Sequence, residues 1–148
     1  MAITLDQIKE LREETGAGIM DVRKALTESE GDTKKAKAWL EAKGMKRAAE
    51  KSERDTESGY VFSYVHFNGK VGSLIKMACE TDFVAKTEDF QNLGKEIAMQ
   101  VASMRPETVE ELLKQDYLRD TSKTIEAMIK LVSGKTGENI KVVNIASL

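Results

Sequence analysis

The 148-residue sequence contains one cysteine, one proline and one histidine. A single cysteine, Cys79, excludes an internal disulfide and is typical of a protein from the reducing cytoplasm. The single histidine, His66, has no second histidine or cysteine at ligand spacing, which argues against a metal centre. No apolar run approaches the roughly 20 residues of a membrane-spanning helix, and the N-terminus has no signal-peptide pattern. We therefore expect a cytoplasmic protein without membrane contact.

Neither the charge nor any motif indicates a nucleic-acid ligand or an enzyme. The 23 Lys and Arg residues and the 25 Asp and Glu residues leave a net charge of −2, which provides no basic field for nucleic acid. Gly134-Lys135-Thr136 resembles the end of a phosphate-binding loop, but Ile129 stands where that loop begins with Gly. We expect no catalytic residue, no bound metal and no cofactor. The sequence favours an interaction protein over an enzyme.

The first 45 residues have helical periodicity. Apolar residues at helical spacing, with a capping box that begins at Thr4, predict three short helices that stop at Gly16, before Glu30 and at Gly44. Met20 lies off the apolar stripe of the second helix. An exposed contact for another protein and a widened core stripe both fit this position.

A polar segment separates these helices from the rest of the chain. Residues 46–58 mix basic and acidic residues without an apolar stripe, which indicates a solvated linker that is helical in part. We therefore expect three parts: a three-helix N-terminal module over residues 1–45, a linker over 46–58, and a core over 59–148.

The core begins with a predicted β-hairpin. Asn68-Gly69 is a strong hairpin signal, and a two-residue turn there places Phe62 opposite Ile75 on an apolar face that should carry a helix. Later apolar patterns predict a helix after Thr87, a short helix with Val109, a helix from Ser122 and a strand over Ile140–Ile145. This order predicts an α+β fold, with helices packed on a small antiparallel sheet.

The stretch Cys79–Lys86 joins a predicted strand to the helix that follows Thr87. It contains an acid, Asp82, next to a large aromatic residue, Phe83. Junctions of this kind lie at the surface, because buried loops leave backbone groups unpaired. The pair is therefore a candidate partner contact. The alternative is that Phe83 folds back and covers the core, and the pattern alone allows both.

Two segments resemble the signature segments of the elongation factor Ts family of bacteria and organelles. They are Leu11–Val22, with the sequence LREETGAGIMDV, and Glu80–Lys86, with the sequence ETDFVAK. The similarity extends over nearly the whole chain and includes the closing Gly-Glu-Asn-Ile segment. The resemblance implies a factor that releases GDP from elongation factor Tu, and an N-terminal module similar to a ubiquitin-associated domain.

The resemblance also implies two sets of contact residues. In the N-terminal module, the residues expected to contact the nucleotide-binding domain of the partner are Arg12, Ile19 and Met20. In the second signature, the residues expected to dislodge the partner's Mg²⁺ are Thr81, Asp82, Phe83 and Val84.

Long members of the family carry a duplicated core, whereas this chain has one core unit and a short connection over Met104–Lys123. A small core leaves sheet edges unpaired and one apolar face uncovered, so we expect a homodimer, as in short members of the family. The alternative function is a small helical adaptor that binds ubiquitin-like or nascent-chain partners through the N-terminal helices. It leaves the second signature unexplained.

Overall fold

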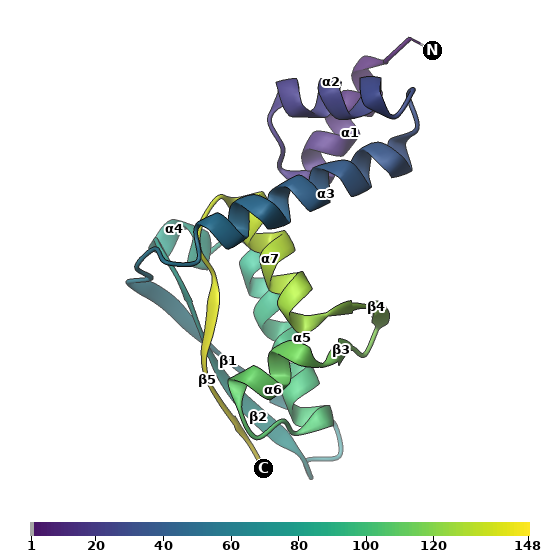
Figure 1. Ribbon diagram of the computed structural model, residues 1–148. Helices are drawn as coiled ribbons and strands as arrows, with labels where there is room; N and C mark the ends of the chain where they lie inside the picture. Colours follow the sequence, from purple (N-terminus) through teal and green to yellow (C-terminus); the bar gives the residue numbers. More distant parts are fainter. Residues whose placement is uncertain (1) are drawn as a thin grey trace.

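The computed structural model describes residues 2–148 and has the predicted α+β architecture. Three helices stand at one end of the molecule, and a small antiparallel sheet packed with helices forms the rest (Figure 1). Within the described range, no helix is both long and apolar enough to cross a membrane.

The N-terminal helices are α1 (Leu5–Thr15), α2 (Ile19–Glu28) and α3 (Thr33–Glu50). The predicted capping box is confirmed: the Gln7 N–H donates to Thr4 Oγ1 at 3.2 Å, and the Thr4 N–H donates to Gln7 Oε1 at 3.0 Å. Gly16 ends α1 in the left-handed conformation, with φ 66°. The three helices share a small buried cluster of Ile8, Leu11, Val22, Ala25, Leu26, Ala36 and Leu40.

The prediction that the third helix stops at Gly44 is wrong, because α3 continues to Glu50. Gly44 lies where α3 crosses α7 (Ile125–Thr136), and a Cβ atom on Gly134 of α7 would lie 2.7 Å from the Gly44 carbonyl carbon. Gly44 therefore allows α3 and α7 to pack closely. In the sequence alone, a glycine with this role looks the same as a glycine that ends a helix. Ala48, in the last turn of α3, is buried.

The sheet consists of β1 (Ser58–Val65), β2 (Gly72–Cys79) and β5 (Lys141–Ser147), in the order β1-β2-β5 with antiparallel pairing. The predicted hairpin register is confirmed, since Phe62 pairs with Ile75. As expected, a helix, α5 (Glu88–Met104), packs on this hairpin.

The remaining elements are α4 (Asp82–Ala85), α6 (Val109–Lys114), β3 (Asp116–Tyr117), β4 (Asp120–Thr124) and α7. The helix predicted from Ser122 begins later, at Ile125, because the Thr124 side chain caps it by accepting from the Ala127 N–H at 3.1 Å. Ser122 lies instead in β4. The β3–β4 hairpin escapes prediction because its strands are short and polar.

A larger buried cluster joins the inner face of the sheet to the helices of the core: Phe62, Ile75, Met77, Cys79, Val84, Ala85, Phe90, Leu93, Ile97, Ala98, Val101, Leu112, Ile125, Ile129, Ile140 and Val142. Cys79, the single cysteine, lies in this core, and burial raises the pKa of its thiol. A thiol in this state is a poor nucleophile.

Candidate partner-binding site

The segment Glu80–Lys86, here called the junction loop, presents one large apolar side chain to solvent. The loop turns sharply from the end of β2 into the four-residue helix α4. Val84 is buried in the larger cluster, whereas Phe83 is 81% exposed. The alternative in which Phe83 covers the core is therefore wrong. The sequence predicts a plain loop here, and the helical turn of α4 is what places adjacent side chains on opposite sides.

Local hydrogen bonds fix this turn. The Val84 N–H donates to Thr81 Oγ1 at 3.3 Å, so Thr81 caps α4. The Ser58 hydroxyl at the start of β1 donates to the Asp82 carboxylate. The Thr87 hydroxyl donates to the Val84 carbonyl at 2.7 Å. These three hydrogen bonds hold both ends of α4, and the bond from Ser58 connects the Asp82 side chain to the sheet.

A residue distant in the sequence also contacts the loop. Glu138 follows α7, and its Oε1 atom accepts from the Glu80 N–H at 3.1 Å and the Thr81 N–H at 2.9 Å. In the opposite direction, Glu80 Oε1 accepts from the Asn139 N–H at 2.8 Å. The local sequence does not indicate a role for Glu138 or Asn139. The available signal was a polar pair between a helix stop at Gly137 and an apolar strand.

The three N-terminal residues Arg12, Ile19 and Met20, here called the N-terminal surface, are all exposed. Met20 is 73% exposed, so the alternative of a widened core stripe is wrong. The surface lies beside the Gly16–Gly18 turn: Arg12 is in the last turn of α1, and Ile19 opens α2.

An ion-pair cluster holds the start of α2 against α3. Asp21 Oδ1 lies 2.7 Å from Lys43 Nζ, and Asp21 Oδ2 lies 2.9 Å from Arg47 Nη2. The hydrogen bond from Lys43 is the main reason that the pKa of Asp21 lies below its usual value. Met20, which precedes Asp21 in the chain, remains exposed beside this cluster.

The N-terminal surface and the junction loop lie on separate elements that α3 connects. The N-terminal half of α3 packs with α1 and α2, and the chain that leaves its other end approaches the loop (Figure 1). There, Arg54 Nη1 lies 3.7 Å from Glu80 Oε1.

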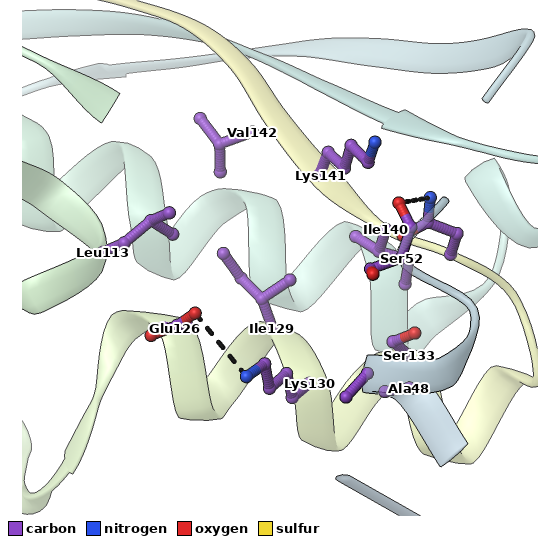
Figure 2. A pocket seen from close by; sticks show the side chains of 12 residues that line it. Ala48, Ser52, Leu113, Glu126, Ile129, Lys130, Ser133, Ile140, Lys141 and Val142 are labelled. Atoms are coloured by element: carbon purple, nitrogen blue, oxygen red, sulfur yellow. Dashed lines mark hydrogen bonds and ion pairs between the residues drawn. The ribbon is translucent and has the colours of Figure 1, made fainter. Parts of the chain in front are cut away.

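A cavity of about 290 Å³ lies between α3, α6, α7 and β5 (Figure 2). Its walls are largely apolar, with Leu113, Ile129 and Val142 among them, and Glu126 pairs with Lys130 at 3.6 Å. The hydroxyl of Ser133 in its wall is engaged, since it donates to the Glu138 carbonyl. Across residues 2–148, no group of three or more His, Cys, Asp or Glu side chains could hold a metal ion.

Comparison with known proteins identifies a consistent set of relatives. A family model described as elongation factor TS matches residues 80–148. Elongation factor Ts of Fervidobacterium nodosum is 44% identical over 147 residues, which cover 91% of this chain and 75% of the relative. Elongation factor Ts of Oleidesulfovibrio alaskensis is 45% identical over 139 residues, 94% of this chain and 70% of the relative.

A third relative differs in length. Elongation factor Ts of Thermotoga neapolitana is 38% identical over 185 residues, which cover 96% of this chain and 94% of the relative. Since that alignment is longer than this chain of 148 residues, the relative carries internal residues that have no counterpart here.

Proposed function

The chain belongs to the elongation factor Ts family, and from this premise we propose that it is a guanine-nucleotide exchange factor that docks on elongation factor Tu and releases its GDP. We place this activity in the cytoplasm, where translation elongation takes place. The protein would accelerate an exchange of ligands on its partner and carry out no chemical reaction of its own.

The observation that carries this proposal is the exposed ring of Phe83 on a rigid turn. The hydrogen bonds of Thr81 and Thr87 fix α4, and Val84 secures it to the core from below. A large apolar side chain held in solvent on such a turn is typical of a binding hot spot, because little conformational entropy is lost when the partner covers it.

The mechanism follows from what Mg²⁺ does in a GTPase. The ion bridges the phosphates of the nucleotide and the loop that binds them, and it neutralises their charge. In our proposal, Phe83 inserts between elements of the partner that support this ion, while Asp82 and Thr81 set the direction of approach. Nucleotide and factor then weaken each other's binding reciprocally, so that either GDP or GTP can enter afterwards.

We assign the N-terminal surface to docking on the partner's nucleotide-binding domain. Ile19 and Met20 are apolar and exposed at the start of a regular helix. Methionine adapts its shape to an opposing surface, and Arg12 adds a charged group beside it. This surface would set affinity, whereas the junction loop would set the rate of release.

We further propose that two copies of the chain pair through the outer face of the sheet. The inner face carries α5, but Val61, Val65, Leu74 and Val143 on the outer side each remain more than half exposed. Around Lys76, which pairs with Val61 and Asn144, these four side chains leave apolar surface on one three-stranded sheet that a second copy of the same sheet would cover. The edges of β1 and β5 would then lie at the rim of the dimer.

The exchange activity is tested by release of fluorescent GDP from purified elongation factor Tu. We expect Phe83→Ala to slow release by about 30-fold, which corresponds to the loss of roughly 2 kcal/mol at a hot spot. Phe67→Ala is the matched control, because Phe67 is an equally large side chain, 92% exposed at the tip of the β1–β2 hairpin. Equal effects of the two substitutions, or no acceleration by the wild-type chain, would contradict the proposal.

The dimer is tested by light scattering after size exclusion at several concentrations. Leu74→Asp places a charge on the outer face and should shift the protein towards the monomer mass of 16.5 kDa. Leu118→Asp, in the β3–β4 turn, is the control and should leave the mass unchanged. A wild-type mass of 16.5 kDa at every concentration rules out the pairing.

A further inference from the structure

We propose that Glu138 is a positioning residue: its carboxylate fixes the backbone of the junction loop so that Phe83 is presented to the GTPase in one orientation. This inference rests on the proposed function of the loop. Glu138 itself lies behind the loop, in the turn between α7 and β5, and it would act through Phe83.

Three donors converge on the Glu138 carboxylate. Oε1 accepts from the N–H groups of Glu80 and Thr81 at 3.1 and 2.9 Å, and Oε2 accepts from the Thr81 hydroxyl at 2.7 Å. Hydrogen bonds to an ionised acceptor are about twice as strong as neutral ones. The two N–H groups belong to the residues immediately before α4, so Glu138 determines where that helix begins.

The Thr81 hydroxyl connects Glu138 to α4. The Thr81 hydroxyl donates its proton to Glu138 and accepts from the Val84 N–H at 3.3 Å. Glu138 therefore selects the side-chain rotamer with which Thr81 caps the helix. Without it, the cap loses its orientation, and Phe83, on the first turn of α4, loses its fixed direction.

Glu138 is itself held in place. Its backbone carbonyl accepts from the Ser133 hydroxyl, and its neighbour Asn139 is buried, with side-chain Nδ2–H groups donating to the carbonyls of Ser52 at 3.2 Å and Arg54 at 2.8 Å. Ser52 and Arg54 follow α3, which carries the N-terminal helices. The Glu138–Asn139 pair thus connects the junction loop to the segment that leads from the N-terminal surface.

A graded series of substitutions weakens the three hydrogen bonds to different extents. Glu138→Ala removes them all. Glu138→Gln retains one acceptor oxygen for the two backbone N–H groups and places an NH₂ donor opposite the Thr81 hydroxyl, which can accept it. Glu138→Asp keeps the charge but withdraws the carboxylate by one methylene group. The maximal rate of GDP release should therefore fall strongly in Glu138→Ala and Glu138→Asp and only slightly in Glu138→Gln.

The test measures GDP release by stopped flow over a range of concentrations of the 148-residue factor. We expect Glu138→Ala to lower the maximal rate about tenfold, as for the loss of roughly 1.4 kcal/mol, with the half-saturating concentration unchanged because the N-terminal surface is intact. Glu138→Gln should restore most of the rate. The double variant Glu138→Ala/Phe83→Ala should be no slower than Phe83→Ala alone, since both act through the same side chain.

Amide hydrogen exchange on the free protein gives a second readout, independent of the GTPase. In Glu138→Ala, the amides of Glu80, Thr81 and Val84 should exchange faster while those of α1 and α2 keep their rates. Unchanged exchange in the loop, or additive losses in the double variant, would overturn the positioning role. If Phe83→Ala releases GDP at the wild-type rate, the proposed function fails, and the loop amides still decide whether Glu138 holds the turn. If Glu138→Ala does not fold, Glu138→Asp takes its place in both measurements.

Discussion

The N-terminal surface and the junction loop both expose apolar side chains, but they are supported differently. Met20 lies in the first turn of α2, a regular helix whose N-cap residue, Gly18, provides no side-chain hydrogen bond. The next residue, Asp21, forms partly exposed ion pairs with α3. Phe83 lies on a four-residue helix that is capped by Thr81 and bonded from behind by Glu138.

From this difference we expect the N-terminal surface to adjust to a partner more readily than the junction loop. The N-terminal helices bury a small cluster of their own, whereas the junction loop is attached to the larger cluster of the core. A docking surface gains from adjustment to its partner, but an inserted side chain loses effect if it can turn aside. We therefore expect substitutions in the two regions to change different quantities.

The largest effect should come from breaking the connection between the regions at the α3–α7 crossing. A Cβ atom on Gly134 would lie 2.7 Å from the backbone carbon and oxygen of Gly44, so Gly134→Ala forces the two helices apart. We expect the free energy of unfolding to fall by about 1–3 kcal/mol, as for other overpacked sites. Urea unfolding followed by circular dichroism measures this loss. The fluorescence of Trp39, the single tryptophan, reports on the N-terminal helices separately.

The same crossing offers a matched control. A Cβ atom on Gly44 would lie 3.7 Å from the Gly134 Cα, an ordinary van der Waals contact. Because alanine is favoured over glycine within a helix by about 1 kcal/mol, Gly44→Ala should leave stability unchanged or raise it. Equal losses for the two substitutions would show that the crossing does not depend on this close approach.

The next effect sharpens the contrast between docking and insertion. Met20→Ala should raise the concentration of factor needed for half-maximal GDP release by about tenfold, in the range of a moderate hot spot. The maximal rate should not change, because the junction loop is intact. Leu5→Ala is the control: Leu5 is an exposed apolar residue in the same helical bundle, outside the N-terminal surface. A fall in the maximal rate for Met20→Ala would place this residue in the release step itself.

The smallest effect concerns the ion pairs of Asp21, the residue that follows Met20. Asp21→Asn should lower the stability of the N-terminal helices by about 0.5 kcal/mol, typical of a partly exposed ion pair. The pKa of Asp21 is lowered below its usual 3.8 in the folded protein, so its contribution is present above that value and is lost as the pH falls through the folded-state pKa. The free energy of unfolding is measured in urea by the fluorescence of Trp39. The difference in this free energy between wild type and variant should be constant near neutral pH and should shrink in acid. A difference that persists at the lowest pH would exclude the ion pair as its cause.

Features that depend on neighbours along the chain could be predicted from the sequence. The capping box of Thr4, the helix stop at Gly16, the hairpin register of Phe62 with Ile75 and the helix after Thr87 were all predicted and are confirmed. Each rests on hydrogen bonds or steric limits within a few residues, or on the side-chain alternation of a hairpin, so the local sequence contains the information. The two signature segments likewise pointed to the family.

Other features depend on contacts between segments that are far apart in the sequence, and these became visible in the tertiary structure alone. Gly44 lies inside a helix because Gly134 packs against it, although the sequence favoured a stop. Phe83 faces solvent because the side chain of the adjacent residue, Val84, packs in the core. Glu138 contacts Thr81 only because α7 and β2 end at the same place. Close approach and burial arise from the packing of whole elements, which the local sequence around Gly44, Phe83 or Glu138 does not specify.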